Sequence, residues 1–273
     1  MKSALKLLVL IDLIFILLLS LSGGVSGVVG DVLYFAAFII PVFIALFGAG
    51  GDASQSELKE ELINKLKPSK SKLLFTLPLL APVVLVVILL SLLTSLVLGE
   101  LGFESPTVED EALIIMLLRH ALVPSILEEM LFRLVPMLLL GAYSKRSCVL
   151  YSSLFFALIH CNLFQIPYAL AAGALFMIAD LAADSIIPSL LLHILNNTLS
   201  VISIKYLTTN EQLLIYVGAI FLVAVISLAF IIKRKREYKS ALSYALSGKL
   251  ELKVLSPLAL IIPTVAVAVA NLI

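Results

Sequence analysis

The sequence has 273 residues, of which 62% are hydrophobic and 14% are charged, and its mean hydropathy is +1.16. A water-soluble globular domain has a much more polar composition, so these values exclude one. With 19 Lys and Arg residues against 18 Asp and Glu residues, the chain also lacks the basic excess that would indicate nucleic acid as a partner.

Apolar runs recur along the whole sequence, and they are long enough to cross about 30 Å of hydrocarbon as helices. We predict an all-α, polytopic transmembrane helix bundle of about eight to nine spans, forming a single integral membrane domain over residues 1–273. The expected spans are residues 3–22, 31–49, 73–98, 108–143, 147–163, 165–182, 187–205, 211–232 and 254–272.

The fourth expected span, residues 108–143, is too long for one straight crossing. Pro124 lacks a backbone donor and disfavours helical structure at the preceding residue. Ser125 and Glu128 then match the spacing of a capping box. We therefore predict a broken or kinked fourth span, with a separate half-helix that begins at about Ile126 inside the membrane.

The basic residues predict the orientation of the chain. They fall on one side of a nine-span arrangement, and the opposite side is nearly devoid of them. Those on the basic side are Lys2, Lys6, Lys59, Lys65, Lys67, Lys70, Lys72, Lys145, Arg146 and Lys233 to Arg236. By the positive-inside rule, the N-terminus is cytoplasmic and the C-terminus is outside.

The connector at residues 50–72 would then lie on the cytoplasmic side. Its Leu58, Leu62 and Leu66 fall on one helical stripe, which indicates an amphipathic helix on the membrane surface. A solvated loop is the alternative.

Polar residues inside the expected spans are the candidates for function. An ionisable side chain near the bilayer centre costs about 2.5–3.5 kcal/mol on insertion scales, so such residues face the bundle interior or a wet cavity. The strongest group consists of Glu128, Glu129, Arg133, His160, His193 and Asn197.

The spacing of these residues predicts how they group. Glu129 and Arg133 are four positions apart, so they share a helical face and can pair. Glu128 points about 100° away from Glu129, which favours a chemical role for one carboxylate and a supporting role for the other. His193 and Asn197 share a face in the same way.

Three short motifs resemble those of a known family. Residues 128–133, Glu-Glu-Met-Leu-Phe-Arg, resemble the E-E-x-x-x-R motif of the CaaX prenyl endopeptidase family, also called the Abi or CPBP intramembrane glutamate proteases. Residues 156–160 resemble its F-x-x-x-H motif, and residues 193–197 resemble its H-x-x-x-N motif. The resemblance covers about residues 105–205, the expected catalytic core.

The resemblance implies an intramembrane endopeptidase that hydrolyses a peptide bond with a glutamate-activated water. Glu128 would be the general base and His160 would help to hold the water, while His193 and Asn197 would form the oxyanion hole. Glu129 and Arg133 would orient the site or the substrate. The substrate would be a membrane-attached protein or peptide, with prenylated CaaX-type proteins as one possibility.

No cofactor is expected, although two Glu and two His residues would also satisfy zinc by ligand type. Arg133 beside the carboxylates argues against a dication, and the sequence has no His-Glu-x-x-His pair. The site is expected between the middle and the cytoplasmic side of the bilayer.

Other functions remain open from the residues alone. Buried Glu and His side chains also serve proton- or ion-coupled transporters. A non-enzymatic immunity or scaffold protein is a third alternative. Taken singly, each histidine is more often a structural residue between helices, and His120, which matches no motif, is interpreted in that way.

Overall fold

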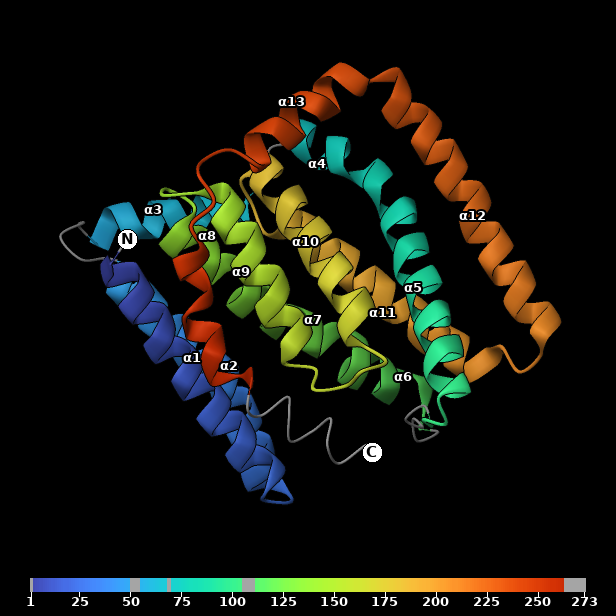
Figure 1. The fold of residues 1–273 in the computed structure, drawn as a ribbon, viewed down its shortest axis with the longest axis horizontal. Helices are drawn as coiled ribbons and strands as arrows, with labels where there is room; N and C mark the ends of the chain where they lie inside the picture. The colour runs from blue at the N-terminus through green and yellow to red at the C-terminus, as the bar shows by residue number, and fades with distance from the viewer. Residues whose placement is uncertain (1, 50–54, 68–69, 105–110, 263–273) are drawn as a thin grey trace.

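The computed structural model describes residues 2–49, 55–67, 70–104 and 111–262. The regular secondary structure in these ranges is all helical, which confirms the predicted class (Figure 1). Six helical stretches are long and apolar enough to cross a membrane, which identifies an integral membrane protein. They are Lys2–Gly23, Val28–Gly48, Lys72–Glu100, Ile166–Ala183, Ile187–Tyr206 and Asn210–Lys233.

The chain forms its helices in the following order. The first five are α1 (Lys2–Gly23), α2 (Val28–Ala49), α3 (Gln55–Leu66), α4 (Lys70–Thr76) and α5 (Leu80–Glu100), with the turn η1 (Leu77–Leu79) before α5. A composite helix follows, made of α6 (Leu113–Met116), η2 (Leu117–Leu122), α7 (Val123–Glu129), η3 (Met130–Leu134) and α8 (Val135–Leu140). The last helices are α9 (Lys145–Leu158), α10 (Ile166–Ala183), α11 (Ile187–Tyr206), α12 (Asn210–Lys233) and α13 (Lys235–Ala245).

The predicted ninth span at residues 254–272 is not seen as a span. The chain forms two 3₁₀ turns there, η4 (Leu252–Leu255) and η5 (Pro257–Leu260). Residues 263–272 lie outside the described ranges. The turns pack against α9 and α1, with Val254, Leu258 and Ile261 buried.

The composite helix does not have the predicted break at Pro124. Two π-helical turns, η2 and η3, stand in its place. Val123 N–H donates to Leu118 O and Val135 N–H donates to Met130 O, five residues back. The donor of each bond is the residue directly before a proline. The hydrogen-bond pattern therefore changes from i−4 to i−5 just before the position at which the proline lacks an N–H. The helix therefore continues through both prolines.

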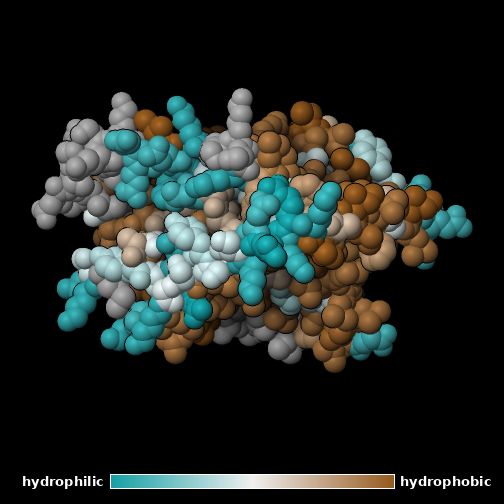
Figure 2. Space-filling model, turned by 90° about the horizontal axis from the view of Figure 1, so that it is seen from above, coloured by the Kyte–Doolittle hydropathy of each residue, from teal (hydrophilic) through white to brown (hydrophobic). Residues whose placement is uncertain are grey.

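The two ends of the bundle differ in charge. The end where α1 begins and α12 ends carries α3, α13 and the start of α9 (Figure 1). We call it the basic end, because these segments contain most of the lysines and arginines. Figure 2 views the molecule from this end and shows hydrophilic residues gathered on it, with hydrophobic residues beside them. The opposite end carries residues 24–27, 101–104, 159–165 and 207–209.

Within the expected connector, Gln55–Leu66 form helix α3 at the basic end, where it crosses the ends of the neighbouring helices (Figure 1). Lys65 Nζ donates to Asp184 Oδ1 at 2.5 Å, and Ser185 Oγ donates to Lys65 O at 2.7 Å. These bonds tie the connector to the turn between α10 and α11.

An aromatic cluster joins the first hairpin to the composite helix. The ring of Phe15 contacts those of Phe38, Phe132 and Phe155 edge to face, with centroid distances of 5.2, 5.8 and 5.7 Å. Edge-to-face pairs of this kind add stability beyond the area they bury. The cluster fixes α1 and α2 against the helices that carry the polar residues.

Close packing of α9 and α10 depends on Gly173. A Cβ atom at this position would lie 3.0 Å from the Cα atom of Ser153. Since real Cβ atoms rarely come so close to a backbone, a larger residue would force the two helices apart.

A buried hydrogen bond between Asp12 and Tyr151 generates a stability prediction. Tyr151 Oη donates to Asp12 Oδ1 at 2.5 Å, and both residues are buried. Removing one partner of a buried hydrogen bond costs about 1–3 kcal/mol. Tyr151→Phe should therefore lower the melting temperature in lipid nanodiscs, whereas Tyr143→Phe, at an exposed position, should not. Equal melting temperatures for the two variants would show that the bond does not stabilise the bundle.

Candidate active site

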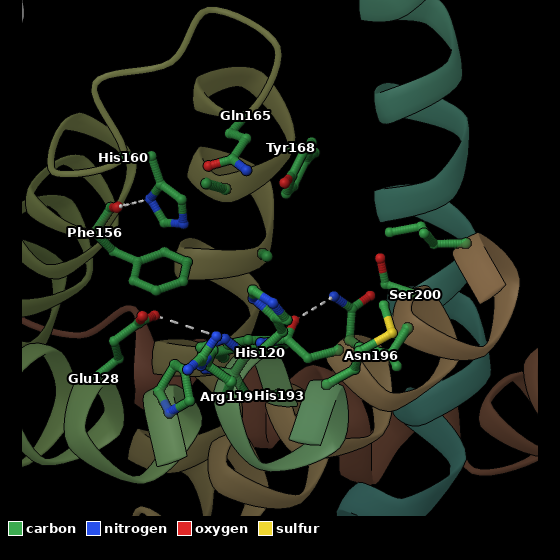
Figure 3. Close-up of a pocket in the computed structure, with 18 of the residues that line it drawn as sticks. Arg119, His120, Glu128, Phe156, His160, Gln165, Tyr168, His193, Asn196 and Ser200 are labelled. Atoms are coloured by element: carbon green, nitrogen blue, oxygen red, sulfur yellow. Dashed lines mark hydrogen bonds and ion pairs between the residues drawn. The ribbon is translucent and has the colours of Figure 1, made fainter. Parts of the chain in front are cut away.

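A cavity of about 360 Å³ gathers polar side chains from several helical segments of the bundle (Figure 3). Glu128 at the end of α7, His160 after α9, and His193 and Asn197 on α11 all line it. Further lining residues come from α2, η2, α10 and α11, among them Tyr34, Arg119, His120, Gln165, Tyr168, Asn196 and Ser200. The structure thus brings three distant regions of the sequence to one space.

Glu129 and Arg133 form the buried support of this cavity. Their side chains have no exposed area, and Arg133 Nε lies 3.1 Å from Glu129 Oε2. The other carboxylate oxygen of Glu129 lies 2.7 Å from His193 Nδ1. Glu129 therefore links the composite helix to α11 and is already paired on both oxygens.

The guanidinium of Arg133 is held by several neighbours besides Glu129. Nη1 donates to Ser152 Oγ at 2.8 Å. The ring of Phe156 lies beneath the guanidinium carbon at 4.7 Å from its centroid, which is the geometry of a cation–π contact. A buried arginine needs such partners, because an unpaired charge in a low-dielectric interior is costly.

Glu128 points to a different place from its neighbour. Its side chain is 14% exposed, it lines the cavity, and its Oε2 lies 3.7 Å from His193 Nε2. This distance is too long for a hydrogen bond, so the carboxylate is free to contact a molecule in the cavity. The expected separation of one buried and one available carboxylate is therefore present in the geometry.

The contact with Glu129 determines which nitrogen of His193 faces the cavity. A carboxylate only accepts hydrogen bonds, so Nδ1 carries the hydrogen that it donates to Glu129. Nε2 is the nitrogen left toward Glu128 and the cavity. It can donate there only when the ring is protonated on both nitrogens.

His160 and Asn197 are oriented by hydrogen bonds to neighbouring residues. His160 Nδ1 lies 2.7 Å from Phe156 O, so this nitrogen donates to the carbonyl and leaves Nε2 as an acceptor. Asn197 Nδ2 donates to Ser125 Oγ at 3.5 Å. Ser125 was predicted to cap a new half-helix, but it is buried inside the continuous helix and supports Asn197 instead.

The start of α11 is anchored by a carboxylate from α10. Asp180 Oδ1 accepts the backbone N–H of Ser189 at 2.9 Å. The first turn of a helix has N–H groups without partners in the helix, and Asp180 satisfies one of them. Because His193 lies one turn further along α11, this bond also fixes its position.

The site contains residues that the sequence motifs did not indicate. Ser152 lies on α9, four positions before Phe156 and eight before His160, which follows the helix. A search for polar residues at this spacing from the F-x-x-x-H motif would have found it. Tyr34 and Tyr168 come from α2 and α10, and no spacing rule connects them with the motifs. Arg119 and His120 also line the cavity, although His120 was assigned a structural role.

The cavity extends from Glu128 toward the opposite end of the bundle. His160 and Gln165 belong to the α9–α10 connection, which is at that end, and Arg119 lies shortly after the start of the composite helix. The expectation that the site lies between the middle and the cytoplasmic side of the bilayer stays a prediction.

An available carboxylate beside two histidines and an asparagine, inside a membrane bundle, is an arrangement that can support acid–base chemistry. Residues 110–199 match the family model described as Type II CAAX prenyl endopeptidase Rce1-like. Through this segment the chain is similar to the Rce1-like family, whose members are peptidases. The similarity indicates that the chain is an enzyme of the peptidase class. No curated protein and no solved structure gives a significant match.

The buried ion pair generates the second prediction. Arg133→Gln removes the charge that neutralises Glu129, and breaking a buried pair typically costs about 3–5 kcal/mol. The variant should show a much lower melting temperature than Arg236→Gln, which changes an exposed arginine on α13.

The double variant Glu129→Gln/Arg133→Gln should recover part of the loss, since neither charge is then left alone. Additive losses in the double variant would indicate that the two side chains do not interact.

Proposed function

We propose that the chain is an intramembrane endopeptidase in which Glu128 activates water to hydrolyse a peptide bond of a membrane-attached substrate. The observation that carries this proposal is the difference between the adjacent carboxylates. Glu129 is fully buried and paired with Arg133 and His193. Glu128 lines the cavity, and its nearest ionic partner, His193 Nε2, lies beyond hydrogen-bond distance at 3.7 Å. A general base needs that availability.

In the proposed reaction, Glu128 takes a proton from a water whose oxygen attacks the substrate carbonyl carbon. Nε2 of His160 accepts a hydrogen bond from the same water and holds it in place. The carbonyl oxygen becomes an oxyanion, which accepts hydrogen bonds from Asn197 Nδ2 and from Nε2 of His193 in its doubly protonated form. When the C–N bond breaks, the proton on Glu128 passes to the leaving amine.

The low polarity of the surroundings favours this stabilisation. Donors that are already oriented in a site shielded from bulk water stabilise an oxyanion better than water does. His193 is oriented by Glu129, and Asn197 is oriented by Ser125. The supporting residues therefore act by fixing the directions of the donors.

We also propose that the reaction needs no metal ion. Glu129 is neutralised by Arg133, and one nitrogen of each site histidine is occupied, by Glu129 for His193 and by Phe156 O for His160. Within the described ranges, no three His, Cys, Asp or Glu side chains group as metal ligands would. A zinc ion would have to compete with Arg133 for the carboxylates.

Replacing Glu128 tests the role of the base. Glu128→Gln keeps the size of the side chain but removes the base, and loss of general-base catalysis typically lowers the rate by about 10²–10⁴-fold. We expect this loss for cleavage of membrane-anchored fluorogenic peptides, at an unchanged melting temperature. Glu211→Gln, on the exposed first turn of α12, is the matched control. Activity above about a tenth of the wild-type rate would contradict the proposed role.

The oxyanion donors generate a second kinetic prediction. His193→Ala and Asn197→Ala should each lower turnover by about 10²-fold or more. Because both donors would bind one oxygen, the double variant should lose less than the product of the two single losses. Strictly multiplicative losses would assign separate functions to the two residues.

Metal independence is checked by elemental analysis of the active protein together with chelator assays. We expect activity without stoichiometric zinc and no effect of chelators of different size and charge. If zinc were bound at one equivalent, and if its removal and return abolished and restored activity, the glutamate would have to be reassigned as a ligand.

A further inference from the structure

A second cavity lies at the basic end, between the first hairpin and the end of the composite helix. Its volume is about 490 Å³, and it shares no lining residue with the cavity beside Glu128. The start of α1, the end of α2 and the end of α8 meet there, and α1 and α2 stand at one edge of the bundle (Figure 1). Most of its lining is apolar, with Ser3, Lys6 and Tyr143 as the polar residues.

Lys6 gives this second cavity a positive charge that nothing in its lining neutralises. It is the one charged residue that lines the cavity. Its side chain is exposed, and within the described ranges it takes part in no hydrogen bond or ion pair. Lys2 lies one turn earlier on the same face of α1, and like charges at this spacing repel each other. The polar end of the cavity is therefore complementary to an anionic group.

The apolar part of the cavity continues along the outside of α1. Leu10 lines the cavity and is followed at helical spacing by Leu13, Leu17 and Leu21, and all of them are exposed. At 1.5 Å per residue, the stripe from Leu10 to Leu21 is about 16 Å long. This length is roughly half of the hydrocarbon core, so the stripe matches a lipid chain in one leaflet.

We propose that the second cavity is a binding site for an anionic phospholipid. The phosphate accepts hydrogen bonds from Lys6 Nζ and from the hydroxyl of Ser3, and one acyl chain lies along Leu10, Leu13 and Leu17. Hydrogen bonds between a charged donor and a phosphate are about twice as strong as neutral ones. Basic pockets between transmembrane helices bind anionic head groups in this way.

The surroundings favour a lipid over a free phosphate ion. The ring of Tyr143 lines the cavity, and tyrosine rings gather at the level of the lipid head groups. A free phosphate would leave the leucine wall uncovered, whereas a phospholipid covers it. Because α1, α2 and α8 all line the cavity, the bound lipid also joins the first hairpin to the composite helix.

Lipid titration of the purified full chain tests the site. The protein in a neutral detergent is titrated with dioleoyl phosphatidylglycerol, and the lipid-bound fraction is measured by native mass spectrometry. Dioleoyl phosphatidylcholine has the same chains without net charge, and inorganic phosphate has the charge without chains. The variant Lys6→Gln is compared with Lys239→Gln, which changes an exposed lysine on α13 at the same end.

We expect a single phosphatidylglycerol to bind in preference to phosphatidylcholine, with an affinity about fivefold weaker in Lys6→Gln and unchanged in Lys239→Gln. The factor corresponds to about 1 kcal/mol for one lysine near a membrane surface. Equal binding of the two phospholipids overturns the inference, and so does an equal effect of the two substitutions. Displacement of the bound lipid by inorganic phosphate would show a phosphate site and not a lipid site.

Photocrosslinking locates the bound lipid. The probe is phosphatidylglycerol with a diazirine in one acyl chain, and the crosslinked peptides of the wild-type chain are identified by mass spectrometry. We expect crosslinks at residues 7–17 and 138–143, reduced in Lys6→Gln but not in Lys239→Gln. Crosslinks confined to other helices would overturn the proposed site. A ligand of the folded state also raises its stability, so phosphatidylglycerol should raise the melting temperature of the wild-type chain more than that of Lys6→Gln, and equal shifts would contradict the inference.

Discussion

The buried contact between Glu129, Arg133 and His193 is the constraint on which the arrangement of the site depends. A charge in the interior of a membrane bundle must be paired, and Glu129 meets this requirement with one oxygen on Arg133 and the other on His193. The pairing joins η3 to α11, while Ser152 and Phe156 bring α9 to the same guanidinium. Three helices are positioned by one ionic contact, and the cavity is the space that remains beside it.

The same contact separates structural and chemical functions within two adjacent residues. Because successive helical positions differ by about 100°, Glu128 cannot share the partners of Glu129. It turns instead toward the cavity, with His193 Nε2 at 3.7 Å. The two nitrogens of the His193 ring therefore point to different carboxylates, Nδ1 to Glu129 and Nε2 to Glu128. A change in either carboxylate affects the same ring.

The sequence predicted the parts of the site that follow from local geometry. The Glu129–Arg133 pair and the shared face of His193 and Asn197 depend on a spacing of four residues within one helix, which can be counted. The continuity of the helix at Pro124 was missed, because the π-helical hydrogen bonds that accommodate it depend on the surrounding packing. The contact of Asp180 with Ser189 was also beyond local reasoning, since it joins two helices. The two 3₁₀ turns η4 and η5, where a ninth span was expected to begin, were also missed, because they form by packing against α9 and α1.

The two π-helical turns have a consequence for how the composite helix tolerates change. Each contains one residue more than an α-helical turn would need, and they lie on either side of the segment that carries Glu128 and Glu129. Loss or gain of a single residue in η2 would rotate Arg119 and His120 about the helix axis while leaving Glu128 and Glu129 in register. The segments before and after each π-helical turn can thus rotate about the helix axis relative to one another. An insertion or deletion in η2 can change the cavity lining at Arg119 and His120 without rotating Glu128 and Glu129.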